Sequence, residues 1–331
     1  MSMIIRKCKK SDVKSLFELD RILETHQWNR RSKKNWNWKY FGGNPSGGSI
    51  FYVAEFNSKI VACFAAIPIT YNVFCKKILA SHSIAMMVHP DWQNKGLIKF
   101  VADKVFDSIK THSILFVYGY PNDKAYKLHK DIFEYKDMFN QITYSLDQKY
   151  YNLNFVNTPI KKKIYKLKVI KKFDKSVDNL FVSARDNYKI CVEKNSKFLN
   201  WRYISRPDKK YYCYGIFENK ILKGYFVLKT YKDGDELKGH IIDYLYDFTN
   251  KKSICDFIVF SSVNLLFKKF KVDDISLWCN GDKLMKKTIS KYSFSSFSKR
   301  KMICRIFDNK LKNKLKKNNW LFTMGDTLEI Y

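Results

Sequence analysis

The chain has 331 residues, of which 46% are hydrophobic and 17% aromatic, so it can bury a large core and, by its length, form two domains. Its 62 basic and 31 acidic side chains give a formal net charge of +31, which points to nucleic acid, an anionic membrane surface or an acidic partner. Residues 1–10 lack the apolar stretch of a secretory signal, and the longest apolar segment, 253–267, is too short and too polar to span a bilayer, so we expect a cytoplasmic protein.

The cysteines and the lysines each have a simple explanation. The eight cysteines are scattered, without a C-x-x-C pair and without a histidine at zinc-binding spacing. We therefore predict neither a metal site nor a disulfide framework, as is typical of a reducing compartment. An AT-rich coding sequence would also explain the charge, because lysine and asparagine are abundant throughout while alanine and glycine are scarce.

Residues 3–50 are expected to form a short strand and a helix, followed by an aromatic and basic cluster. The cluster contains Trp28, Trp36 and Trp38 among lysines and arginines. Such interleaving can stack single-stranded bases and contact phosphates. The alternative is a helix whose indoles pack on the edge of a sheet, and we favour it because the cluster recurs later in the chain.

Residues 51–106 predict a hairpin, a further strand, a tight loop and a helix. Runs rich in β-branched and aromatic residues at 51–56 and 60–66 flank a turn at 57–59, and 78–88 supplies the next strand. A loop with Pro90 and Gly96 follows, and apolar residues then repeat at helical spacing from Leu97. This loop predicts an anion site, because N–H groups and the dipole at a helix N-terminus favour phosphate.

The same loop resembles the pyrophosphate loop of the GNAT N-acyltransferases. The pattern of that family is V-x-P followed by Q/R-x-x-G-x-G/A. This chain has Val88-His89-Pro90 and then Gln93-x-x-Gly96-x-Ile98, in which Ile98 replaces a small residue. The resemblance implies that an acyl-CoA, in the first place acetyl-CoA, binds here as co-substrate and that no metal is needed. The residues implied to bind it are Met86, Met87, Val88, Gln93, Asn94, Lys95, Gly96, Leu97, Ile98 and Asn122.

Residues 113–135 predict a strand at 114–120 and a helix that begins near Asn122. Asn122, Ala125 and Leu128 match the N-x-x-A-x-x-L-Y of the fifth strand and fourth helix of GNAT proteins, and His129 stands at the tyrosine position. The resemblance implies that His129, or Tyr126 in the same helix, protonates the leaving thiolate, a role that suits the near-neutral pKa of imidazole. The alternative for His129 is an ordinary helix histidine that makes one hydrogen bond.

The second half repeats the first. Asn37-Trp38-Lys39-Tyr40 recurs as Asn200-Trp201-Arg202-Tyr203, and the hairpin at 55–61 recurs at 216–222, which indicates a duplicated unit. We expect an α/β (α+β) fold of two tandem GNAT-like domains, each a mixed, mainly antiparallel sheet flanked by helices. The expected parts are an acyl-CoA domain at 1–150, a basic linker or crossover at 151–180, and a degenerate copy at 181–331.

The second copy has no Gln-x-x-Gly between its strand at 237–248 and its helix at 253–270, so we expect it to lack a coenzyme site and to shape the acceptor pocket. Its tail, 320–327, resembles the W-x-x-T-x-G-D ending of tandem-GNAT proteins encoded with bacterial surface-polysaccharide genes. Many of these also carry W-[KR]-Y and G-[FY]-P-N, the latter present here at 119–122.

The resemblance implies an acyl-CoA-dependent N-acyltransferase, in the first place an N-acetyltransferase, that transfers directly to the amine of an amino sugar or sugar nucleotide. The charge would also suit an acidic acyl carrier protein as donor. An ammonium must lose a proton before it attacks, and the candidate bases are His82, Ser83 and Asp326. Two alternatives remain: a catalytically inactive GNAT scaffold and a basic nucleic-acid-binding module. The latter is disfavoured because no aromatic strand motif of an RNA-recognition fold occurs.

Overall fold

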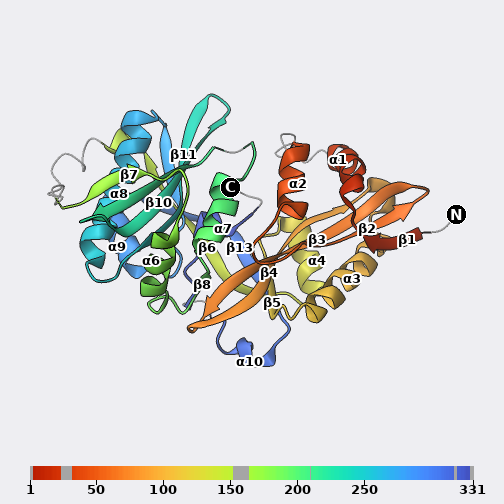
Figure 1. Ribbon diagram of the computed structural model, residues 1–331. Coiled ribbons are helices and arrows are strands. Elements are labelled where there is room, and N and C mark those ends of the chain that lie inside the picture. The colour runs from red at the N-terminus through yellow and green to blue at the C-terminus, as the bar shows by residue number, and fades with distance from the viewer. Residues whose placement is uncertain (1–2, 24–31, 152–163, 209, 317–318, 329–331) are drawn as a thin grey trace.

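A computed structural model describes residues 3–23, 32–151, 164–208, 210–316 and 319–328. Its centre is one mixed, mainly antiparallel sheet of 13 strands that runs through both halves of the chain (Figure 1). Along the sheet the order is β1-β2-β3-β4-β5-β13-β6-β12-β11-β10-β9-β7, and β8 pairs separately with β3. The expected fold class is confirmed.

The first half contributes two pairs of helices and, besides its last strand, five strands. The strands are β1 (Met3–Lys7), β2 (Ile50–Phe56), β3 (Lys59–Val73), β4 (Lys76–Val88) and β5 (Phe116–Gly119). The helices are α1 (Val13–Ile22), α2 (Lys33–Phe41), α3 (Leu97–Thr111) and α4 (Asp123–Asp131). Helices α1 and α2 cover one face of the sheet, and α3 and α4 cover the other (Figure 1). Each pair seals a separate part of the hydrophobic core.

The second half repeats this order of elements. Its strands are β7 (Lys166–Val169), β8 (Ile190–Val192), β9 (Tyr212–Glu218), β10 (Ile221–Asp233), β11 (Glu236–Tyr246) and β12 (Asp274–Leu277). Its helices are α6 (Lys175–Arg185), α7 (Ser196–Leu199), α8 (Lys251–Asn264), α9 (Lys283–Ser290) and α10 (Asn309–Lys312). Residues 164–180 of the expected linker contain β7 and the start of α6, and 152–163 lie outside the described residues.

The duplication is visible in the backbone and at the junction of the halves. Both repeated hairpins turn through two residues with positive φ, Asn57 and Ser58 in one and Asn219 and Lys220 in the other. Such two-residue turns match the twist of the flanking strands. Trp38 stacks on Trp201 with ring centroids 4.8 Å apart, and its Nε1–H donates to the Trp201 carbonyl at 3.1 Å. The repeated tryptophans therefore join the halves to each other.

The expectation that the indoles of α2 pack on the sheet is confirmed. Trp36 is 1% exposed and lies among Phe17, Tyr40 and Phe51, while Trp38 is 6% exposed. Buried indoles cannot stack on bases, so the nucleic-acid hypothesis is wrong for these two residues. That hypothesis also used Trp28 and the basic run at 161–172, of which Trp28 and residues 161–163 lie outside the described residues.

The two halves exchange their last strands. Strand β6 (Lys136–Asp147) belongs to the first half by sequence but pairs with β12, and β13 (Ser295–Ile306) belongs to the second half but pairs with β5. The two exchanged strands also pair with each other, which makes the sheet continuous. Sequence reasoning set a boundary at 150 and did not anticipate this exchange.

We expect residues 1–150 produced alone to be unfolded or aggregated. Without β13 the edge of β5 has no partner, and β6 has lost both strands that flank it, leaving exposed N–H and C=O groups that template aggregation. Co-expression with 151–331 should restore a soluble complex. The measurement is a 1H–15N spectrum of each preparation, and a dispersed, folded spectrum of 1–150 alone would contradict the expectation.

Candidate active site

Strands β4 and β5 separate partway along their length. Among the described residues their parallel pairing is confined to Ser81 with Val117 and His82 with Tyr118. We call the point of separation the apex. There the Ser83 hydroxyl donates to the Tyr118 carbonyl at 3.1 Å. Beyond the apex, β4 continues to Val88 against β3 alone. The edge of β4 that faces β5 is therefore open for backbone hydrogen bonds to a ligand.

A bulge lies on β4 next to this opening. Cys63 on β3 pairs with Met87 and Ala65 pairs with Ile84, so Ala85 and Met86 together oppose one residue. Ala85 has φ +52°, which is uncommon for a residue other than glycine, and bulges re-aim the backbone groups of the strand they interrupt. The Met86 side chain packs toward α3 and α4 and that of Met87 toward α1 and α2, as pleated strands require.

The loop after β4 has the geometry of an anion site. A 3-10 turn at Pro90–Trp92 leads to Asn94 and Gly96, whose φ angles are +59° and +73°, and Gly96 is the N-cap of α3. Residues 93–96 are exposed, whereas Leu97 is 6% exposed and anchors the helix in the core. In the first turn of α3 the Lys99 N–H already donates to the Gly96 carbonyl at 3.0 Å. The N–H groups of Leu97 and Ile98 precede the first intrahelical acceptor, so they and the helix dipole can hold a diphosphate.

Two side chains of this loop, those of Gln93 and Lys95, contact neighbouring groups. The Gln93 amide donates from Nε2 to the Val88 carbonyl at 3.1 Å, which ties the loop to the end of β4. The Val88 carbonyl thus already accepts one hydrogen bond. The Lys95 ammonium lies 5.5 Å from the centre of the Trp92 ring and its side chain is exposed, so it can reach a bound phosphate.

Asn122 stands across the opening at the start of α4. Its side-chain oxygen accepts from the Ala125 N–H at 2.9 Å, which makes it the N-cap, and it is exposed. The structure thus places the ten residues implied to bind coenzyme around one opening: Met86, Met87, Val88, Gln93, Asn94, Lys95, Gly96, Leu97, Ile98 and Asn122. Their contact with a coenzyme stays a prediction.

The two candidate acids of α4 both have partners. His129 is 5% exposed among aromatic rings, and its Nδ1 lies 2.7 Å from the Ala125 carbonyl, so Nδ1 carries a proton that it donates. Burial lowers the pKa of His129, which disfavours the charged form that could protonate a thiolate. The Tyr126 hydroxyl donates to the Asp137 carboxylate at 2.8 Å. This geometry suits packing for His129, and the catalytic role of either residue stays a prediction.

His82 and Asp326 meet at the apex, although they are far apart in sequence. The His82 ring stacks on Tyr118 with centroids 4.8 Å apart, and the Tyr118 hydroxyl donates to the Asp326 carbonyl at 2.9 Å. The Asp326 carboxylate points the other way, to within 3.3 Å of the Lys194 ammonium. Burial raises the pKa of Asp326. This carboxylate is committed to an ion pair inside the second half, which argues against its role as the base.

Sequence reasoning missed the residues that hold Asp326. Lys194 and Asp243 are 0% exposed and form an ion pair, and Arg202 donates to two carbonyls of the tail. Arg202 had a usable signal, because it lies in the repeated W-[KR]-Y. Lys194 and Asp243 had none, because a lysine between Glu193 and Asn195 reads as exposed, and an aspartate within an apolar run does not reveal its partner.

The position in the second half that corresponds to the coenzyme opening is filled by side chains. Strand β11 separates from β12 after Ile241 and Leu277, as β4 does from β5. The Tyr246 hydroxyl there donates to Asp282, the N-cap of α9, at 2.9 Å, and Tyr188 packs beside it. Asp282 is 3% exposed, whereas its counterpart Asn122 is exposed.

We therefore expect one acetyl-CoA to bind per chain. A second coenzyme would have to displace Tyr188 and Tyr246 from Asp282, whose pKa burial already raises. The measurement is the stoichiometry of a calorimetric titration against a chain concentration fixed by amino-acid analysis. Two equivalents of coenzyme per chain would show that the second copy also binds it.

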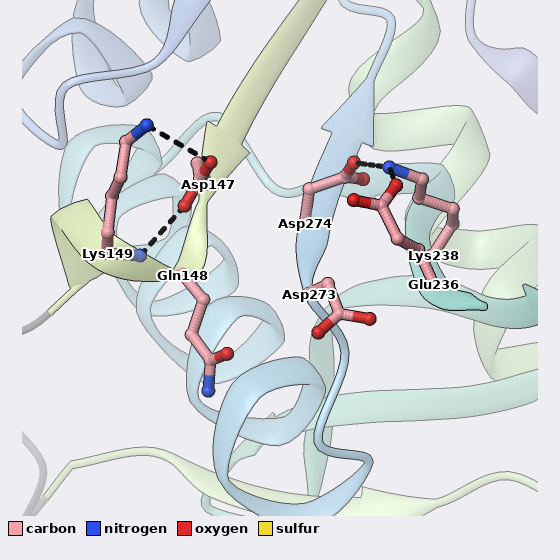
Figure 2. A pocket seen from close by; sticks show the side chains of 7 residues that line it. All are labelled: Asp147, Gln148, Lys149, Glu236, Lys238, Asp273 and Asp274. Carbon is pink, nitrogen blue, oxygen red and sulfur yellow. Dashed lines mark hydrogen bonds and ion pairs between the residues drawn. The ribbon is translucent and has the colours of Figure 1, made fainter.

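A pocket between the C-terminal end of β6 and the second half is not part of this opening. It encloses about 580 Å³ at the N-terminal ends of β11 and β12 (Figure 2). Its Lys238 is already paired with Glu236 and Asp274, and Asp147 with Lys149. Within the described residues, no group of three His, Cys, Asp or Glu side chains is placed to hold a metal ion. Across the same residues, no helix is long and apolar enough to cross a membrane.

Comparison with known proteins agrees with this geometry. Residues 5–131 match the family model of the acetyltransferase (GNAT) domain. Among solved structures, a GCN5-related N-acetyltransferase from Anabaena variabilis superposes with a TM-score of 0.67 at 11% identity, over 93% of this chain and 73% of that chain. N-myristoyltransferase from Saccharomyces cerevisiae with bound myristoyl-CoA has a TM-score of 0.64 at 13% identity, over 97% and 83%.

A tandem GNAT protein from the clavulanic acid biosynthesis pathway has a TM-score of 0.64 at 10% identity, and the match covers 92% of this chain and 98% of that chain. At these identities the likeness shows the fold. No curated protein matches the sequence. The matched acetyltransferase domain and the N-acetyltransferase neighbours support an acyltransferase. Residues 5–131 match a GNAT acetyltransferase domain, and over most of its length the chain has a fold like that of a tandem GNAT protein.

Proposed function

We propose that the protein transfers an acyl group, in the first place acetyl, from coenzyme A directly to an amine. The observation that carries this proposal is the open edge of β4 beside an exposed anion loop. Together they offer a diphosphate site at residues 93–98 and backbone groups at Met86 and Met87 for the arm of the coenzyme. Asn122 would contact the arm from the other side of the opening.

Direct transfer needs the amine to lose a proton and the thiolate to gain one. Asp326 is committed to Lys194, so His82 and Ser83 at the apex are the nearer candidates for handling the amine proton. His82 could take that proton only by giving up the Leu328 N–H, from which its Nδ1 accepts at 3.4 Å. Tyr126 is the candidate for the thiolate proton, because its hydroxyl is hydrogen-bonded on the half-exposed side of α4. Each assignment rests on position at the opening.

We propose an amino sugar, free or nucleotide-linked, as the acceptor. The support is the order of the three motifs, W-[KR]-Y, G-[FY]-P-N and W-x-x-T-x-G-D, which resembles that of tandem proteins encoded with bacterial surface-polysaccharide genes. A net charge of +31 would also favour a nucleotide diphosphate, and an acidic carrier protein would be a competing acyl donor.

The test is a calorimetric titration with acetyl-CoA, followed by an assay of thiol release with UDP-glucosamine as acceptor. We expect a micromolar dissociation constant, about −8 kcal/mol, and thiol release that depends on both substrates. Absence of binding by acetyl-CoA and by myristoyl-CoA would overturn the coenzyme site. Binding without release would place the acceptor in another class of amine.

A further inference from the structure

The tail of the second half, residues 320–328, crosses the junction and is buried throughout. Trp320, Phe322 and Leu328 are 0% exposed, and Asp326 is 1% exposed. The tail makes isolated bridges with Ile190 and Asn280 rather than joining the sheet as a strand. Backbone hydrogen bonds of Leu321 and Phe322 hold its start, and beyond Phe322 its position depends on side-chain contacts.

Three residues of the second half bind this tail, and we call them the tail clamp: Lys194, Arg202 and Asp243. The Lys194 ammonium pairs with Asp243, lies 3.3 Å from Asp326 Oδ1 and donates to Thr323 Oγ1 at 3.2 Å. Arg202 donates from Nε to the Gly325 carbonyl at 3.1 Å and from Nη2 to the Thr327 carbonyl at 2.8 Å.

The tail also packs closely against the residues of the clamp. The Tyr203 hydroxyl donates to Asp243 Oδ2 at 2.9 Å and passes so close to Gly325 that a Cβ there would lie 2.0 Å from the hydroxyl oxygen. Glycine is therefore required at 325 for the tail to reach the clamp. The W-[KR]-Y motif of the second half therefore contacts the G-D of the tail directly.

The other side of the tail contacts the apex of the coenzyme opening. The Asp326 carbonyl accepts from the Tyr118 hydroxyl at 2.9 Å, and the Leu328 N–H donates to His82 Nδ1 at 3.4 Å. A backbone N–H can only donate, so His82 Nδ1 is the acceptor and a neutral ring carries its proton on Nε2. The tail contact therefore favours the tautomer of His82 with the proton on Nε2, while stacking on Tyr118 orients the ring.

We propose that Lys194, Arg202 and Asp243 are positioning residues for the acyl-transfer site, which they serve by holding the tail against His82. This inference rests on the proposed function for its purpose, but its structural content is independent of the acceptor. The second half contributes to the acyl-transfer site through the tail. The donor loop at residues 93–98 belongs to the first half and does not depend on the tail.

The test uses the full-length chain labelled with 15N at its six histidines. Imidazole 15N spectra report which ring nitrogen is protonated, and a His82→Gln variant assigns the His82 signals. In the wild type we expect one tautomer with the proton on Nε2. In Gly325→Ala we expect the single tautomer to be lost, because the added Cβ drives the tail from Tyr203.

The double variant Gly325→Ala/Tyr203→Phe removes the clashing oxygen and is expected to restore the wild-type tautomer. Gly239→Ala is the matched control, since it crowds a buried glycine of β11 with atoms at 3.1–3.2 Å but does not contact the tail. It should leave His82 unchanged. If Gly325→Ala does not fold, Thr323→Val is used instead, because it removes the tail hydroxyl that contacts Lys194 and Asp243 without adding bulk.

Calorimetry with acetyl-CoA separates this inference from the proposed function. We expect the dissociation constant of Gly325→Ala to stay within about threefold of the wild-type value, because the donor loop is separate from the tail. An unchanged His82 tautomer in folded Gly325→Ala and Thr323→Val, or an equal change in Gly239→Ala, would overturn the inference. A wild type that binds no acetyl-CoA would overturn the proposed function, while the spectra would still decide the clamp.

Discussion

A Gly96→Glu variant is expected to bind acetyl-CoA at least about 100-fold more weakly than the wild type, a loss of about 2.7 kcal/mol. Gly96 has φ +73°, and a Cβ there would meet no atom within 4 Å. The new side chain therefore fits, and its effect has two sources. The left-handed backbone costs a non-glycine residue about 1–2 kcal/mol. The carboxylate also repels the diphosphate and competes for the N–H groups of α3.

Two further variants separate these sources in the same titration. Gly96→Ala keeps the backbone cost and lacks the charge, so it should weaken binding by about tenfold or less. Gly43→Glu places the same side chain on another glycine with positive φ, +68°, and open surroundings, in the turn between α2 and β2. It should bind acetyl-CoA as the wild type does. Full binding by Gly96→Glu would show that the coenzyme lies elsewhere.

Replacing Lys194 with methionine is expected to lower the free energy of unfolding by about 3–5 kcal/mol. The ammonium is 0% exposed and lies between Asp243 and Asp326, so its loss leaves buried carboxylates without a counter-charge. Guanidinium unfolding at neutral pH measures the difference. Adding Asp243→Asn to Lys194→Met should recover part of the loss, because it removes one of the two stranded charges.

The pH range of this stabilisation follows from the pKa of Lys194. Burial is the largest influence and would lower the pKa, but the charges of Asp243 and Asp326 outweigh it and raise the pKa above its ordinary 10.5. A lysine with a raised pKa stabilises the fold fully below 10.5 and loses this effect as the pH rises through the folded value. The loss in Lys194→Met should therefore be the same at pH 7 and pH 9.

An exposed pair provides the comparison for Lys194→Met. Lys99 lies 2.9 Å from Asp103 on the surface of α3. Lys99→Met should cost less than about 1 kcal/mol, because solvent screens an exposed pair and the freed aspartate stays hydrated. Equal effects of Lys99→Met and Lys194→Met would mean that the buried cluster does not hold the tail.

The sequence by itself determined the features that depend on neighbouring residues. The strand, loop and helix around Gly96 follow from apolar periodicity and one glycine that allows a left-handed turn. Asn122 is a cap because its side chain reaches the N–H three residues on, and both hairpins follow from their two-residue turns. The duplicated order of elements is also local information, since it repeats the same patterns.

Only the tertiary structure decided which distant segments meet. Strands β6 and β13 each fit an edge of either half, and their pattern of apolar residues does not say that the two are exchanged. The bulge at Ala85 and the burial of Lys194 with Asp243 likewise depend on strands and segments remote in sequence. Hydrogen-bond ladders and ion pairs gain their energy from such remote partners, so local propensity cannot reveal that the tail would reach His82.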